Sequence, residues 1–434
     1  MGRIDASTVT KQFKNTFDET ELNELGKATR LCRREREATP YRLMLALLES
    51  FTSGRLDSIA DIHRSFNALC RSQIRYKPFH NQLSKSGFAA FTHAVFTRVL
   101  SGLACEVLRF SPESPFARFE HIRIQDGTSF ALHSSLADVF PGRFTATHPA
   151  AVELHVELDL LSEMPNRVVL APDSASEPQF LPEPHEMASG LLLADRGYFA
   201  KGYLAALQRA AASFIVRSKT DINPLIVEAF GPDGCALEQF IGRRMREIKA
   251  KMAKYPCLDL TVRFDSDGAP LQCRLIVHPN ARRDGVPRYL ATNLERHRFT
   301  IEHVSTAYRL RWQIELLFKE WKSHANLRGF STRNENIAEG LIWASLCAAT
   351  VQRYCAHMAE RIRRIAISTR IVAKSLHHVL HAILDDLLHD PAHLRASVAG
   401  ALEYLATNAR RAHPKRDRTS GRLRNELRHV HAPA

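Results

Sequence analysis

The chain has 434 residues, of which 45% are hydrophobic, so it can bury a large core and wholesale disorder is excluded. Its formal charge of +14 favours a polyanionic partner, although a merely soluble basic protein would show the same charge. No stretch of about 18 apolar residues is present, which excludes a membrane-spanning helix. The first residues lack the apolar centre of a signal peptide and no two cysteines form a C-x-x-C pair, so we expect a cytoplasmic protein with reduced thiols.

Residues 1–115 are predicted to be helical, and the apolar run at 40–48 is the clearest helix. Segments 58–63 and 78–83 are predicted to be two short helices separated by a polar turn. This pattern resembles a helix-turn-helix weakly, and a plain helical scaffold fits it equally well.

The pattern changes near residue 118. Five strands are predicted from alternating or apolar runs at 121–126, 152–160, 167–170, 191–195 and 213–217. A helical stretch at 200–212 separates the last two, and this order favours an α/β layer with a mixed sheet. The polar face of the second strand carries Glu153, His155, Glu157 and Asp159. We expect this face to meet solvent or a covering helix, with Asp159 as an alternative metal ligand.

Residues 220–300 are predicted to be a small β-rich insertion, because strands at 258–264 and 271–277 flank the turn at 266–270. The chain is then predicted to be helical from residue 300 to about 409. Residues 410–431 are basic and rich in turn-forming residues, which is typical of a solvated tail or of an arm that contacts DNA phosphates. The cations of this tail are Arg410, Arg411, Lys415, Arg416, Arg418, Arg422, Arg424 and Arg428.

Residues 308–322 are predicted to form one amphipathic helix. At about 100° per residue, one face carries four polar groups within an arc of roughly 60°: Tyr308, Arg311, Glu315 and Lys322. The opposite face is apolar and should pack on the core, through Leu310, Ile314, Leu317 and Trp321. An ordinary helix with a solvated face would show the same spacing. One acid between two cations also suits a metal-binding carboxylate flanked by phosphate-binding groups.

Two aspartates are predicted to end strands, Asp126 the first strand and Asp195 the fourth. Carboxylates at strand ends of α/β sheets lie where ligands bind, and these two would be adjacent if their strands are neighbours. Divalent cations would then relieve their repulsion, and three carboxylates that hold two ions about 4 Å apart are a known arrangement for phosphodiester chemistry. Taken singly, each aspartate could equally be a turn or cap residue.

Three motifs now stand in order along the chain. Tyr308, Arg311, Glu315 and Lys322 fill the pattern Y-x2-R-x3-E-x6-K, Asp126 lies in Gln-Asp-Gly-Thr-Ser-Phe, and Asp195 lies in Leu-Ala-Asp-Arg-Gly-Tyr-Phe. From about residue 118 to 345 the sequence resembles the DDE transposases of bacterial insertion sequences, of the insertion-sequence-four family.

The resemblance implies an α/β fold with an RNase H-like catalytic core at 116–219 and 301–345, interrupted by the β-rich insertion at 220–300. A helical N-terminal DNA-binding domain at 1–115 and a helical C-terminal region at 346–434 would flank it. The C-terminal region, with its basic tail, would serve dimerisation or DNA contact. The resemblance also implies a homodimer that binds double-stranded DNA at two transposon ends, in the cytoplasm or nucleoid of a bacterium.

The site residues follow from the same resemblance. Asp126, Asp195 and Glu315 would bind two Mg²⁺ or Mn²⁺ ions and carry catalysis, while the DNA contacts would come from Tyr308, Arg311, Lys322 and Arg196. The expected chemistry is hydrolysis that frees a 3′-OH, followed by transesterification into target DNA. Two alternatives are a catalytically silent DNA-binding protein, such as a transposition inhibitor or host-adopted regulator, and an RNase H-like nuclease that cuts without joining.

Overall fold

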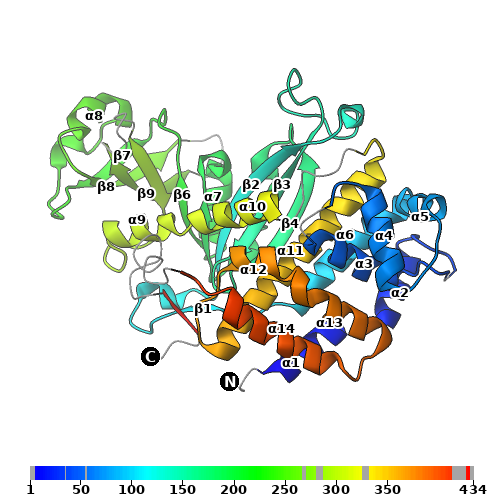
Figure 1. The fold of residues 1–434 in the computed structure, drawn as a ribbon. Helices are drawn as coiled ribbons and strands as arrows, with labels where there is room; N and C mark the ends of the chain where they lie inside the picture. Colours follow the sequence, from blue (N-terminus) through cyan, green and yellow to red (C-terminus); the bar gives the residue numbers. More distant parts are fainter. Residues whose placement is uncertain are drawn as a thin grey trace.

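The computed structural model of the chain describes residues 5–34, 36–53, 56–265, 270–279, 287–324, 332–412 and 427–430. Within these residues the chain forms one large mixed sheet and a body of helices beside it (Figure 1). This mixed α/β composition confirms the fold class expected from the sequence at its coarser level.

Helices occupy most of the described part of residues 1–115. They are α1 (Ala6–Thr16), α2 (Glu19–Ala28), α3 (Pro40–Thr52), α4 (Ile59–Leu69), α5 (Tyr76–Leu83) and α6 (Ser86–Gly102). Side chains fix where the first three begin, because Asp5, Asp18 and Thr39 each accept a hydrogen bond from a backbone N–H of the first turn. Pro40 then takes the first position of α3, where its missing N–H leaves no bond unmade. The three helices predicted between residues 40 and 83 are confirmed as α3, α4 and α5.

The chain is helical again near its C-terminus. The helices are α11 (Glu335–Arg363), α12 (Thr369–Ser375), α13 (His377–His389) and α14 (Leu394–Asn408). The prediction of helix to about residue 409 is therefore confirmed for the described residues. The long α11 packs against α3 and α6, and α14 packs against α1. The N- and C-terminal helices thus form one body, blue to cyan and yellow to red in Figure 1. Gly340 permits the close approach of α11 and α6, because a Cβ there would lie 2.3 Å from the Phe88 ring.

One nine-stranded sheet crosses the described residues, in the order β4-β3-β2-β5-β6-β10-β9-β8-β7. Its strands are β2 (Ile122–Ala131), β3 (Ala151–Asp159), β4 (Met164–Pro172), β5 (Leu191–Ala194), β6 (Ser213–Arg217), β7 (Leu225–Phe230), β8 (Leu258–Phe264), β9 (Leu271–His278) and β10 (Arg288–Thr292). β5 runs parallel to both β2 and β6, whereas the other neighbours are antiparallel. The five strands predicted before residue 220 are confirmed as β2 to β6. The predicted helix between the last two is α7 (Lys201–Arg209), which makes the crossover that parallel strands require.

Residues 220–300 extend the same sheet. They supply β7 to β10 together with α8 (Met245–Met252), and β10 pairs directly with β6, with Leu290 opposite Arg217. The two strands of the predicted hairpin are confirmed as β8 and β9, which are antiparallel neighbours. Residues 266–269 of its turn lie outside the described residues.

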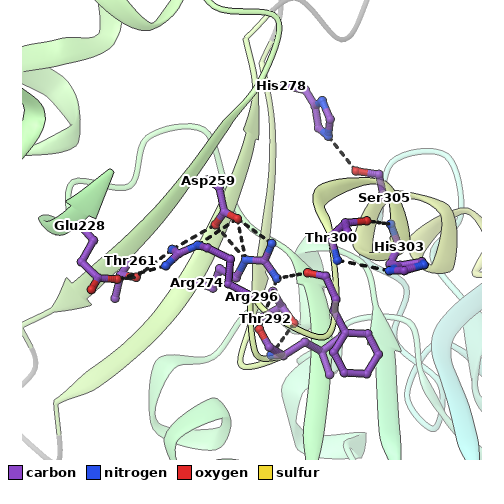
Figure 2. A network of polar contacts seen from close by, with 12 residues as sticks. Glu228, Asp259, Thr261, Arg274, His278, Thr292, Arg296, Thr300, His303 and Ser305 are labelled. Atoms are coloured by element: carbon purple, nitrogen blue, oxygen red, sulfur yellow. Dashed lines mark hydrogen bonds and ion pairs between the residues drawn. The ribbon is translucent and has the colours of Figure 1, made fainter. Parts of the chain in front are cut away.

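A buried ion network joins β7, β8 and β9 to the segment that leads into α9 (Ile301–Arg309), as Figure 2 shows. Arg274 of β9 donates to Asp259 of β8 at 2.6 Å and to the carbonyl oxygen of Phe299 at 2.6 Å. Arg296 contacts Asp259 at 3.1 Å and Glu228 of β7 at 3.2 Å. Because Phe299 lies two residues before α9, the network fixes where that helix starts.

The expectation for the polar face of the second predicted strand, now β3, is wrong. Three of its residues are 5% exposed or less: Glu153, His155 and Glu157. Two short 3-10 helices, η3 (Glu177–Phe180) and η5 (Arg196–Tyr198), contribute to their cover in place of solvent or an α-helix. His155 stacks on Phe180 at a centroid distance of 3.7 Å, and its Nδ1 lies 3.4 Å from the hydroxyl of Tyr198. Asp159 accepts a hydrogen bond from the Ser162 backbone at 2.8 Å, which is the contact of a turn residue.

The basic tail is described only in part. Arg410 forms an isolated bridge with Ile367, and Arg428 lies in β11 (Leu427–His429). β11 pairs with β1 (Leu108–Phe110), which places Arg428 opposite Arg109. Five further cations lie outside the described residues: Lys415, Arg416, Arg418, Arg422 and Arg424.

Five of the eight cysteines are buried. Burial raises the pKa of the Cys70 thiol to about 12, which keeps the thiol protonated and unreactive. In the part of the chain that the structure describes, no helix is both long and apolar enough to cross a membrane.

Candidate active site

Two parallel strands bring the predicted aspartates together. β2 and β5 pair as far as Gln125 and Ala194, so Asp126 and Asp195 are the next residues along each strand. Their proximity was expected only if these strands are neighbours, and the sheet order shows that they are. Asp195 directly follows β5 and is the N-cap of the short 3-10 helix η5 (Arg196–Tyr198).

The prediction that Asp126 ends its strand is wrong. β2 continues to Ala131, because β3 goes on pairing with it after β5 has turned away. The next residue, Gly127, faces the other side of the sheet, where a Cβ would lie 2.2 Å from Oε1 of Glu153. A glycine here therefore lets β3 and its buried polar face pack directly behind Asp126. Burial, with the nearby Glu177 carboxylate, raises the pKa of Glu153 to about 7.

The predicted single helix at 308–322 is two helices, α9 (Ile301–Arg309) and α10 (Trp312–His324). Between them, Arg311 and Ile314 donate backbone bonds to the carbonyls three residues earlier, at Tyr308 and Arg311. This tighter turning interrupts the α-helix, and such turns often mark functional sites. The expected core face is confirmed, because Leu310 and Trp321 are both 1% exposed.

The break between α9 and α10 brings the polar residues of this segment into contact with the two aspartates. The hydroxyl of Tyr308 donates to Oδ1 of Asp195 at 3.1 Å. The guanidinium of Arg311 donates through Nη1 to Asp126 and through Nη2 to Oε1 of Glu315, the latter at 2.6 Å. Five predicted site residues therefore meet at one edge of the sheet, and they come from β2, the end of β5, α9, the break and α10.

Arg217 belongs to the same site and was not predicted. It ends β6, and its Nη1 lies 3.8 Å from Oδ1 of Asp195. β6 runs parallel to β5, so both strands deliver their last residues to the same edge of the sheet. Arg217 ends a predicted strand just as Asp195 was expected to, so its position could have been predicted on the same ground.

Burial and like charge raise the pKa of Asp126 to about 6. Burial is the main cause, Asp195 and Glu315 add repulsion, and Arg311 opposes the change. Burial also disfavours the charged form of Arg311, but the nearby Asp126, with Tyr308 and Asp195, holds the pKa of its guanidinium above the usual value. The pKa of Tyr308 is raised by burial and by Asp195, so its hydroxyl stays protonated and can donate.

The three carboxylates supply oxygen ligands only, which is the donor set that Mg²⁺ prefers. Among the residues that the structure describes, no group of three or more His, Cys, Asp or Glu side chains is arranged to hold a metal ion. The guanidinium of Arg311 lies between Asp126 and Glu315, where its charge balances both. A divalent cation would balance the same carboxylates once Arg311 withdraws, so the donor chemistry fits a metal ion.

The two remaining predicted DNA contacts lie around this centre. Arg196 is exposed and directly follows Asp195 at the start of η5. Lys322 is half-buried on α10, about two helical turns beyond Glu315.

The family described as "Transposase DDE domain" matches residues 117–351, which is more than half of the chain and spans every site residue. The chain belongs to this family.

Relatives of this DNA transposase share its family at low identity. The transposase of insertion sequence element IS1151 from Clostridium perfringens is 20% identical over 350 residues, 73% of each chain. The transposase of IS231E from Bacillus thuringiensis subsp. finitimus is 21% identical over 402 residues, 84% of this chain and 82% of that one. A solved piggyBac transposase synaptic complex with hairpin DNA has a TM-score of 0.43 at 10% identity, over 90% of this chain and 84% of that one.

Proposed function

We propose that this transposase moves an insertion sequence by cutting and joining DNA, with Asp126, Asp195 and Glu315 as the ligands of two Mg²⁺ or Mn²⁺ ions. One observation carries the proposal. The register of β2 and β5 and the break before α10 bring carboxylates from three separate elements to one edge of the sheet. The Arg311 contacts to Asp126 and Glu315 then join the helix to the strand.

Each residue has a distinct task in this proposal. Tyr308 and Arg217 hold the Asp195 carboxylate in place through contacts at 3.1 and 3.8 Å. Arg311 balances Asp126 and Glu315 in the free protein and is released toward the scissile phosphate when metal ions take over that charge. Bound ions would polarise the phosphodiester and neutralise the charge that develops on it. Lys322 and Arg196 would bind neighbouring phosphates as cations.

The fold supports an RNase H-like core of the insertion-sequence-four type. The order β4-β3-β2-β5-β6, antiparallel for its first three strands and parallel for its last three, forms the half of the sheet that carries both aspartates. The helical body of α1–α6 and α11–α14 lies beside it. We assign DNA-end binding to residues 1–115, and pairing of two copies in a homodimer to residues 346–434.

The test is cleavage and joining of a DNA duplex that carries one end of the insertion sequence. Asp126→Asn, Asp195→Asn and Glu315→Gln should each lower cleavage by at least about 10²-fold, because the ions lose a ligand. Binding of the same duplex in Ca²⁺, which accepts looser geometry, should stay within a few-fold of wild type. Asp159→Asn is the matched control. The Asp159 carboxylate accepts a hydrogen bond within a turn, so this variant should cleave DNA at the wild-type rate.

Each outcome has a meaning. If one of the three variants cleaves DNA at the wild-type rate, the residue that it changes does not belong to the site. Cutting without joining by the wild-type protein would favour a nuclease, and binding without any cutting in Mg²⁺ or Mn²⁺ would favour a silent DNA-binding protein.

A further inference from the structure

A second polar site lies beside the carboxylates and has no part in the contacts described above. It is a cavity of about 470 Å³ at the carboxyl ends of β5 and β6. The chain that leaves β5 through Asp195 reaches it at Phe199 and Lys201, and the chain that leaves β6 through Arg217 reaches it at Lys219. The segments that follow two residues of the active site therefore form part of the lining, and residues between 222 and 265 form the rest.

The rim of the cavity is cationic. Lys201 and Lys219 are exposed, and the single carboxylate of the lining, Asp265, is paired with Arg244 at 2.6 Å. Arg244 is also tied to the carbonyl of Asn223 at 3.3 Å. The ion pair cancels the charges of Asp265 and Arg244, which leaves the two lysines as the net charge of the rim.

The N-terminus of α7 adds to this field. Ala200 and Lys201, the N-cap and first residue of α7, both line the cavity, and within the described residues no side chain caps this helix. The first backbone N–H groups of an uncapped helix carry a partial positive charge and favour anions, phosphate among them. Part of the lining is apolar, because Phe199 and Phe264 both line the cavity and contact each other with ring centroids 5.7 Å apart.

We propose that this cavity binds one phosphate and deoxyribose of the DNA strand that runs from the carboxylate site, with the phosphate at Lys201, Lys219 and the start of α7. The Phe199 and Phe264 rings receive the sugar. This inference rests on the proposed function for its ligand, because the cleaved strand is the polyanion that must pass this edge of the sheet. By this proposal the ends of β5 and β6 have a second task, which is to hold the cleaved DNA strand in line with Asp195.

The experiment combines a protein change with a DNA change. A Lys201→Gln, Lys219→Gln double variant removes the rim charge, and a duplex series carries one neutral methylphosphonate at each position near the cleavage site. Binding is measured in Ca²⁺ with the full chain. The matched control is Lys249→Gln, Lys254→Gln, which removes two exposed lysines near α8 that do not line the cavity.

For wild type and control, methylphosphonate should weaken binding at the phosphates held by Arg196 and Lys322. It should also weaken binding by about tenfold, the size of a lost charged contact, at one further position. The Lys201, Lys219 variant should bind unmodified DNA about tenfold more weakly and lose nothing further at that position. Its binding should also depend less on salt, by about one unit of the logarithmic slope. If it shows the same positional loss as wild type, or if no further position is sensitive in wild type, the cavity does not bind the strand.

These results do not depend on turnover. Failure of the proposed function would appear as a lack of cleavage by wild type in Mg²⁺ or Mn²⁺. Failure of the cavity assignment would appear in the binding series, whether or not the protein cuts.

Discussion

The hydroxyl of Tyr308 and the carboxylate of Asp195 meet although they are 113 residues apart in the chain. In the mechanism proposed above, Tyr308 orients Asp195 as a metal ligand through this one hydrogen bond. Tyr308→Phe keeps the ring and removes the hydrogen bond, so cleavage should fall by about 10- to 100-fold, equivalent to about 1–3 kcal/mol. Thermal melting and DNA binding in Ca²⁺ should stay near wild type.

Tyr41→Phe is the matched control for Tyr308→Phe. The Tyr41 hydroxyl also donates across a long stretch of chain, to the carbonyl of Leu387 at 2.9 Å, but within the helical body. Its loss leaves a buried carbonyl without this donor, so melting should fall while cleavage per folded molecule is retained. If the two variants behave alike, the Tyr308 contact is structural and does not serve the site.

His278 gives the fold a dependence on pH. Burial, with the nearby Arg288, lowers the pKa of His278 to about 4, and its Nε2 lies 2.9 Å from the hydroxyl of Ser305 on α9 (Figure 2). The unfolded chain takes up this proton near pH 6.5, so the contribution of the neutral ring is complete above that pH and is lost as the pH falls toward 4. We expect a loss of about 1–2 kcal/mol over this range after allowance for partial exposure.

Denaturant unfolding at a series of pH values measures this contribution. His278→Gln keeps a donor for Ser305 and should flatten the profile between pH 6.5 and 4. His297→Gln changes an exposed ring, 72% accessible, and should leave the profile as in wild type. An unchanged profile in His278→Gln would assign the acid sensitivity to other groups.

The sequence predicts the ionisable residues of the site better than it predicts their contacts. Asp126 is found at the end of an alternating run and Asp195 at the end of an apolar run, both predicted to be strands, and Glu315 is found because an amphipathic helix has a polar face. The position of Arg311 between two carboxylates depends on a side-chain contact between the break before α10 and β2, which no local pattern records. Arg217 lies at the end of a predicted strand and could have been identified in the same way as Asp195, but it was not predicted.

Among the elements, the break between α9 and α10 could not be predicted from periodicity. The apolar positions on both sides of it, Leu310 and Ile314, are buried in the same core, so the hydrophobic pattern runs through the break without interruption. The polar side of β3 shows the same limit. Alternation marks which residues share a face, but a loop with polar partners can bury that face as completely as a helix can.

The ion network at the start of α9 makes the insertion part of the catalytic structure. Arg274 is 6% exposed and Asp259 is 3% exposed, so this ion pair is out of water and both ions need partners. Arg274→Met leaves the Phe299 carbonyl without this donor and costs Asp259 its closest cation, so it should destabilise the fold by about 3–5 kcal/mol. Chemical denaturation measures this value.

A double variant separates charge from shape. Asp259→Leu added to Arg274→Met removes the buried carboxylate that has lost its closest cation, so much of the lost stability should return, as it does when apolar groups replace buried ion pairs. Arg71→Gln breaks the pair between Arg71 and Asp385, which are 65% and 33% exposed, and should cost less than about 1 kcal/mol. If the double variant is less stable than Arg274→Met, the network acts by packing and the charge pairing is incidental.

At the scale of the whole molecule, the helices from both ends of the chain form one body beside the sheet, although the sequence suggests them as separate regions (Figure 1). Contacts between segments more than 200 residues apart, such as α11 with α6 and α3, create this arrangement. Periodicity reports which face of each helix is apolar but not which helix covers it. The basic tail starts from this body at Arg410, next to Ile367, and ends where β11 joins β1.

Both ends of the tail are thus held to the protein, and its five intervening cations can be tested without disturbing them. The variant changes Lys415, Arg416, Arg418, Arg422 and Arg424 to Gln and keeps β11. Each cation that contacts a phosphate adds about 0.9 to the logarithmic salt slope of DNA binding, so the slope should become shallower by about 4 if most of them do. The matched control changes five exposed cations around α8 to Gln: Arg243, Arg246, Lys249, Lys251 and Lys254. The control loses the same charge, so a larger slope change in the tail variant assigns the contacts to the tail. An unchanged slope in the tail variant means that these cations are solvated and that the affinity for DNA comes from elsewhere.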